Sequence, residues 1–60
     1  MFFLVTVRWH PDGKGEVETY QVNVRAVRGD DHTLVLDGSG GLEVRFPLAY
    51  IEWVQMERKG

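Results

Sequence analysis

Two polar clusters hold the residues of this chain whose types could support metal or acid–base chemistry. They are His10 and Asp12 in the first cluster, and Asp30, Asp31 and His32 in the second. Imidazole and carboxylate groups together suit zinc or another first-row divalent ion. Their spacing matches no known ligand motif, however, and all five lie in turn-like segments, where Asp commonly hydrogen-bonds the local backbone. We therefore interpret both clusters as solvated turns and expect no metal and no cofactor.

Nucleophilic catalysis has little support in the sequence. The chain has no cysteine, and its only serine, Ser39, lies in a glycine-rich run (Gly38–Gly41) without an evident base partner. That run could offer backbone amides to an anion, but it precedes an expected strand, whereas phosphate-binding loops precede a helix. A chain of 60 residues also has little room for a concave site that excludes water. We expect a protein that is not an enzyme.

The aromatic residues give the clearest sign of a binding surface. The chain has three Phe, two Tyr and two Trp, more than so small a core can bury completely. Trp and Tyr side chains commonly dominate the binding energy of protein interfaces. The expected contact residues are Trp9, Tyr20, Tyr50 and Trp53, with Asp30 and Asp31 as an acidic rim. The alternative is that both Trp are core residues and both Tyr are half covered.

The first strand carries a second candidate surface. Its two faces are both apolar over Phe2–Val7, and a small fold covers only one of them. Phe2 and Leu4 therefore either lie beneath the C-terminal segment or form a self-association patch, so that a homodimer is one expected partner. The backbone of this terminal strand could equally extend the sheet of a partner.

Nucleic acid is the competing class of partner. Arg8, Arg25 and Arg45 have the outward parity on three expected strands, and exposed aromatic rings could stack on bases. The formal net charge is −2, however, and glutamates alternate with these arginines, which is the ordinary pattern of a solvated sheet. Nucleic-acid binding is therefore kept as the alternative.

Composition and length predict one globular domain over residues 1–60. The chain is 43% hydrophobic and 27% charged, which is typical of a folded protein. Its longest apolar run, Met1–Val5, is too short to cross a membrane and has no basic leader. The lack of cysteine favours a reducing compartment, and a cytoplasmic location is expected.

Three clusters of Gly, Asp and Pro divide the chain into strands. They are 10–15, 29–32 and 37–41, and the last is the clearest hairpin signal. Between them apolar residues recur with a period of two, as in Phe3, Val5, Val7 and Trp9. The run 16–28 changes face at Val27, which predicts a bend that lets it serve two sheets.

Two further strands complete the expected fold. One, 42–46, follows the strand 33–37 and is closed by Pro47; the last begins at Ile51 after one tight helical turn over 47–50. In that last strand either Trp53 or Val54 faces inward, because a register slip of one residue exchanges the faces. Five strands on short turns predict an all-β, five-stranded small barrel.

The order of these elements resembles that of the Src-homology-3-like small barrel. That fold begins with a strand and an irregular loop, continues with a long bent strand and a distal hairpin, and ends with one helical turn and a last strand. The segment Arg45–Val54 looks like the Pro-Ser-Asn-Tyr-Val stretch that ends such domains, with Pro47, Tyr50 and Ile51 at matching places. The resemblance implies the fold and a surface role for Tyr50. The Ala-Leu-Tyr-Asp-Tyr-like start and the Trp after the second loop are missing, so proline-rich recognition is not implied. An Sm-like or oligonucleotide-binding barrel is the alternative fold.

These observations predict a non-enzymatic protein-interaction module. Its small size and lack of catalytic groups fit a small bacterial or phage regulator that binds a larger protein or associates with itself.

Overall fold

The computed structural model describes all residues 1–60 and is built almost entirely of strands. The strands are β1 (Phe2–Trp9), β2 (Glu18–Val24), β3 (Ala26–Gly29), β4 (Thr33–Asp37), β5 (Glu43–Pro47) and β6 (Ile51–Lys59). Two single-turn 3₁₀ helices, η1 (Ser39–Gly41) and η2 (Leu48–Tyr50), lie on either side of β5. Neither helix is long or apolar enough to cross a membrane.

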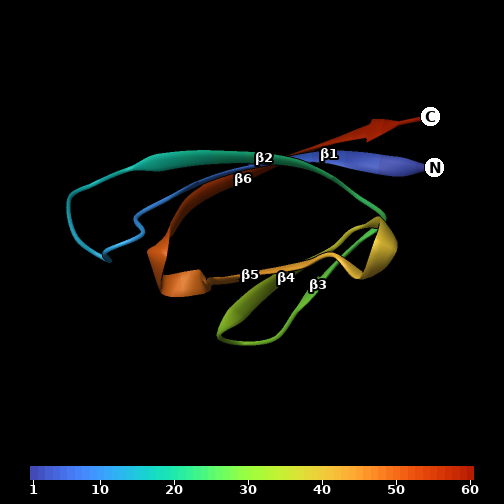
Figure 1. Cartoon of the computed structure of the whole chain (residues 1–60). Helices are drawn as coiled ribbons and strands as arrows, with labels where there is room; N and C mark the ends of the chain where they lie inside the picture. The colour runs from blue at the N-terminus through green and yellow to red at the C-terminus, as the bar shows by residue number, and fades with distance from the viewer.

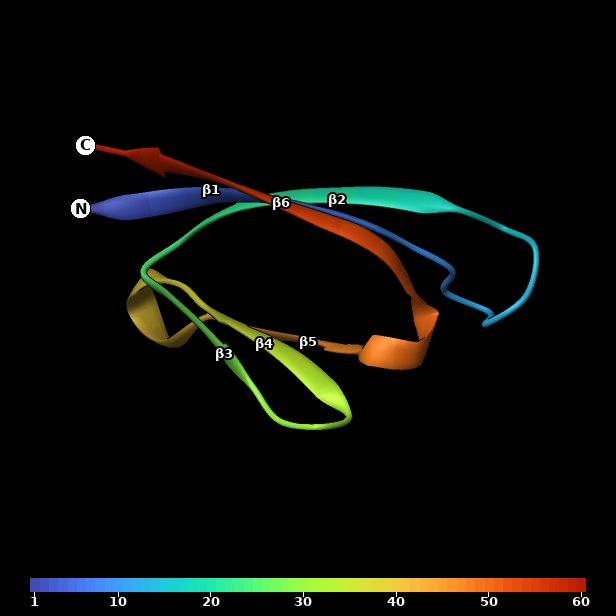
Figure 2. The same ribbon diagram turned by 180° about the vertical axis from the view of Figure 1, so that it is seen from behind.

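The strands form two antiparallel sheets that lie as separate layers (Figures 1 and 2). In the first sheet the order is β2-β1-β6, and in the second it is β3-β4-β5. The all-β prediction is confirmed, but six strands in two sheets with no closed barrel replace the expected single barrel of five. The difference arises because the long second run divides into two strands, and because no ladder of hydrogen bonds joins β6 to β5.

The division falls at Arg25, where the chain passes from one sheet to the other. β2 ends at Val24 opposite Phe3 in the first sheet, and β3 begins at Ala26 opposite Asp37 in the second. The Arg25 amide donates a hydrogen bond to the Asp37 carbonyl at 2.7 Å, which fixes the bend to the second sheet. The run 16–28 therefore bends and serves two sheets as predicted, but the break lies at Arg25, two residues before the expected change of face at Val27.

The core lies between the sheets and is small. Its buried members are Val5 and Val7 of β1, Val24 of β2, Leu36 of β4 and Phe46 of β5. Partly buried side chains of the same parity, including Phe3 and Trp9, pack against this cluster. The period-two pattern of the first strand therefore identified its inward face correctly.

The last strand has an irregular register that settles which of its residues face inward. Val54 lies opposite Val7, and Trp53 lies opposite Arg8 on the outer face of the first sheet. Trp9 then pairs with Ile51, so Glu52 is an extra residue, as in a β-bulge. Val54 is thus the inward residue, and Trp53 points away from the core.

Candidate partner-binding surface around η2

Two segments, the β1–β2 loop and the β3–β4 turn, meet η2 at one end of the molecule (Figure 1). The His10 amide donates to the Tyr50 carbonyl at 2.8 Å, which joins the β1–β2 loop to η2. The Leu48 amide donates to the His32 carbonyl at 2.8 Å, which joins the β3–β4 turn to the other end of η2. Pro47 cannot donate to a ladder, so β5 ends there and the chain is free to make this turn.

Tyr50 is held in place while remaining accessible. A Cβ atom on Gly13 would lie 2.9 Å from the Tyr50 ring, so only glycine lets the loop backbone approach the ring this closely. Gly13 also has a positive φ of 73°, which favours glycine at this turn. Tyr50 and Leu48 are 37% and 40% exposed, so η2 presents two apolar side chains to solvent. We call Leu48 and Tyr50, together with the turn residues Asp30–His32, the η2 surface.

Asp30 shapes the turn at the edge of this surface. Its Oδ1 atom accepts hydrogen bonds from the amides of His32 at 2.8 Å and Thr33 at 3.0 Å. These two backbone hydrogen bonds lower the pKa of Asp30 below its ordinary value. Asp12 makes a similar local bond to the Lys14 amide, at 2.9 Å. Both carboxylates therefore organise turns, and no group of three or more His, Cys, Asp or Glu side chains converges to hold a metal ion.

The β1–β2 loop is tied to the first sheet through Glu52, the extra residue of the bulge. Glu52 Oε1 lies 3.1 Å from Arg8 Nε, and Oε2 lies 3.0 Å from His10 Nε2. His10 Nδ1 lies 3.0 Å from the Glu16 carbonyl oxygen. A carbonyl and a carboxylate can only accept, so both contacts of the ring are hydrogen bonds when the imidazole carries both protons. The bulge thus positions a carboxylate that anchors the start of the loop.

The six residues expected to form one contact site are distributed over different parts of the fold. Trp9 packs edge-on against Phe46, with ring centroids 4.8 Å apart, and Tyr20 lies tilted against the same ring at 5.6 Å. The Trp9 Nε1 atom is buried without a hydrogen-bond partner. Trp53 is 44% exposed on the outer face of the first sheet. The turn that holds Asp30 and Asp31 is joined to the helical turn that holds Tyr50 by the hydrogen bond from the Leu48 amide to the His32 carbonyl.

Phe2 and Leu4 occupy the outer face of β1. β1 is the middle strand of its sheet, with β2 on one side and β6 on the other. Its backbone is therefore already paired along both edges, which corrects the expectation that the first strand could extend a partner's sheet. Phe2 remains 38% exposed and Leu4 is half-buried.

The three arginines of the nucleic-acid alternative do not share a face. Arg8 lies on the outer face of the first sheet, and Arg45 lies on the outer face of the second, 3.3 Å from Glu43. Arg25 lies at the bend between the sheets. Two of the three cations are thus paired with carboxylates, and phosphate binding needs several uncompensated cations in one place.

A network of charges covers the outer face of the second sheet. Arg28 contacts Asp37 at 2.5 Å and Glu43 at 2.6 Å. Its hydrogen bond lowers the pKa of Asp37, and the same bond raises the pKa of Arg28. Val35 lies between Arg28 and Arg45 in the ladder and is buried on this outer face, consistent with cover from the arginine stems.

Acid should weaken the fold through Asp37. Because its folded pKa is below the unfolded value of about 3.9, ionised Asp37 stabilises the fold above that value, and this contribution is lost as the pH falls through the folded pKa. The urea midpoint of Asp37→Asn should therefore be lower than that of the natural chain at about pH 6, and the two should converge towards about pH 2. If the difference in urea midpoint between Asp37→Asn and the natural chain did not change with pH over this range, the stabilising role of ionised Asp37 would be contradicted.

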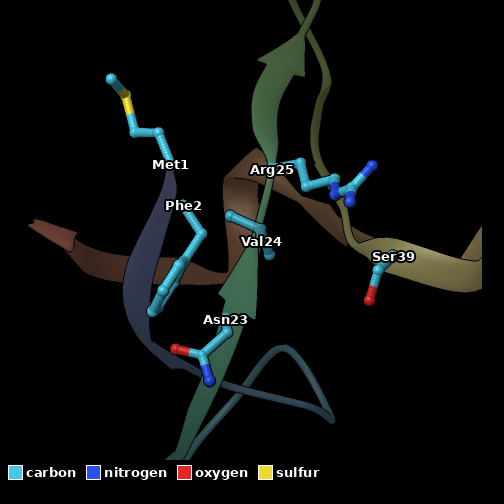
Figure 3. A pocket seen from close by; sticks show the side chains of 6 residues that line it. All are labelled: Met1, Phe2, Asn23, Val24, Arg25 and Ser39. Carbon is cyan, nitrogen blue, oxygen red and sulfur yellow. The ribbon is translucent and has the colours of Figure 1, made fainter. Parts of the chain in front are cut away.

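One open pocket, of about 310 Å³, lies beside η1, at the opposite end of β5 from η2 (Figures 1 and 3). Its lining residues are Met1, Phe2, Asn23, Val24, Arg25 and Ser39. Arg25 is its one charged side chain, and no acid or base faces it across the pocket. The pocket therefore has no pair of groups suited to proton transfer.

Sequence reasoning missed several exposed apolar residues, namely Leu42, Leu48, Val54 and Met56. Leu48 occupies the first position of the helical turn that ends at Tyr50. Because Tyr50 was expected at the surface, the position of Leu48 in the same turn could have indicated that Leu48 is exposed too. Comparison with protein-family models, with curated proteins and with solved structures finds no match to this chain.

Proposed function

We propose that this chain is a non-enzymatic protein-interaction module, a small regulator that binds a larger protein or a second copy of itself. The observation that carries the proposal is the η2 surface. There, two loops hold Tyr50 and Leu48 in place while about two fifths of each side chain stays exposed. A rigid, half-exposed aromatic side chain loses little conformational entropy on binding and can bury much apolar area.

The acidic turn beside η2 favours a particular kind of partner. Asp30 and Asp31 are both exposed, and the backbone hydrogen bonds that lower the pKa of Asp30 stabilise its ionised form. A partner that offers an apolar pocket for Tyr50 with a basic rim would complement this surface. We propose a protein partner of that chemistry.

The element order supports a Src-homology-3-like arrangement as the framework of this module. A first strand and loop, a long bent strand, a tight hairpin, a helical turn and a last strand follow one another along the chain. In that arrangement the loops on either side of the bent strand and the helical turn lie at one end, where Tyr50 is. This proposal concerns the framework only, because the residues that read proline-rich peptides in such domains are missing.

The test is affinity capture from a lysate of the source cell with the natural chain and with the double variant Leu48→Ala, Tyr50→Ala. Loss of an interface anchor costs about 2 kcal/mol or more, roughly a thirtyfold rise in Kd. We therefore expect the double variant to lose a protein that the natural chain retains in the presence of nuclease. Leu42→Ala is the matched control, because Leu42 directly precedes the start of β5 and is a leucine of similar exposure, 44% against 40% for Leu48.

Three outcomes would speak against the proposal. If the natural chain and a folded double variant retained the same protein equally, the η2 surface would not be the binding site. Loss of binding in Leu42→Ala as well would indicate a general effect on the fold. Retention that disappears with nuclease would instead favour nucleic acid, and charge reversal at Arg8, Arg25 and Arg45 would then be the next comparison.

A further inference from the structure

β6 is an edge strand with an apolar surface that nothing in the fold covers. It lies at the end of the strand order β2-β1-β6, so its outer row of backbone amides and carbonyls has no strand beside it. Trp53, Val54 and Met56 are 44%, 38% and 57% exposed. By contrast, β2, the other edge of this sheet, carries no exposed large hydrophobic residue. An unpaired edge strand of nine residues with three exposed apolar side chains is a template for pairing with another strand.

The exposure of β6 results from the limited reach of the second sheet. Val54 and Met56 have the same inward parity as Val7 and Val5, which lie opposite them and are fully buried. The core thus covers the inner face of β1 and stops short of β6. An additional strand beside β6 would extend the first sheet in the direction where apolar side chains are still exposed.

Symmetry and apolar pairing identify a second copy of β6 as the strand that fits. Full overlap of two antiparallel copies of Ile51–Lys59 places Gln55 on a twofold axis, with Val54 opposite Met56 of the other copy. This register pairs apolar with apolar on the inner face, twice. Parallel pairing would instead place like charges opposite one another.

We infer that a second copy of this chain pairs with β6 in this antiparallel register, which joins the two first sheets into one continuous sheet. This deepens the proposed function, because it makes a second copy one of the module's partners. It uses β6, however, and not the η2 surface or the outer face of Phe2 and Leu4.

Single-cysteine variants test both the contact and its register, because the natural chain has no cysteine. Gln55→Cys places the same residue of both copies across the twofold axis and should form a covalent dimer under mild oxidation. Gln21→Cys is the matched control, because Gln21 is an exposed glutamine of the opposite edge strand. Crosslinking in Gln21→Cys but not in Gln55→Cys, or in neither variant, would overturn the inference.

Met56→Lys tests the contact without a crosslink. Met56 is mostly exposed, so the single chain should tolerate lysine, whereas an edge lysine opposes strand pairing. In sedimentation velocity the natural chain should be a dimer, and Met56→Lys should raise the dimer Kd at least about tenfold. Leu42→Lys, on the other sheet, should leave the dimer intact. A monomeric natural chain at high micromolar concentration would overturn the inference, and partner capture through η2 would be unaffected.

Discussion

Phe46→Ala should leave the chain largely unfolded at 25 °C. Phe46 is the largest fully buried side chain, and both Trp9 and Tyr20 pack on its ring. Truncation of a buried Phe to Ala costs about 3–5 kcal/mol through lost burial and the cavity left behind. A core of this size supplies only about 3–5 kcal/mol in total, so the loss removes most of the stability. Loss of the dispersed amide spectrum and of the cooperative urea transition would be the measured result.

Phe2→Ala provides the matched control for this prediction. Phe2 is 38% exposed on the outer face of β1, so the same substitution there removes much less burial. We expect a loss of about 1 kcal/mol or less, seen as a small shift in the urea midpoint. If Phe46→Ala and Phe2→Ala shifted the midpoint equally, the assignment of the core around Phe46 would be wrong.

Gly29→Ala should have the second-largest effect, at the turn between β3 and β4. A Cβ atom at this position would overlap the backbone carbonyl oxygen of Thr33. That oxygen accepts the 3.0 Å hydrogen bond from the Asp30 amide that closes the turn. The backbone must move to make room, and overpacking of this kind costs about 1–3 kcal/mol. The free energy of unfolding, measured with urea, should fall by that amount.

Gly15→Ala is the control, because no atom lies within 4 Å of a Cβ added there. It should be neutral or raise the free energy of unfolding by up to about 1 kcal/mol, since alanine restricts the unfolded chain. The same backbone movement in Gly29→Ala should disturb the acidic side of the η2 surface, which Asp30 organises. If Gly29→Ala and Gly15→Ala had the same free energy of unfolding, the close approach of Gly29 to the Thr33 carbonyl would be contradicted.

The two proposed surfaces differ in how they depend on the fold. The η2 surface is built from two segments far apart in the sequence, the β3–β4 turn and η2, which one backbone hydrogen bond joins, and a second such bond ties η2 to the β1–β2 loop. The β6 edge is a single segment, but it is exposed only because β1 lies on one side of it and the second sheet does not reach it. Substitutions at Tyr50 and at Met56 should therefore separate the proposed partner binding from the proposed self-association.

The local features of the fold could be predicted from the order of the residues. Alternation of apolar residues identified the inward face of β1, and the change of parity at Val27 indicated the bend between sheets. Gly, Asp and Pro located the turns, and Pro47 located the end of β5. These features follow from backbone geometry and from the direction of successive side chains in a strand, and both depend only on near neighbours in the chain.

The tertiary structure alone decided which of these residues are accessible. Trp9 and Trp53 are the same residue type on paired strands, yet one packs on Phe46 and the other lies on the outer face. The extra residue at Glu52 sets that outcome, because it shifts the register of β6 against β1. Strand parity predicts only which face of a sheet a residue lies on. Which strand forms the edge, and how far the opposite sheet reaches, depend on pairing between distant segments. The exposure of Trp53 and Met56 follows from that pairing.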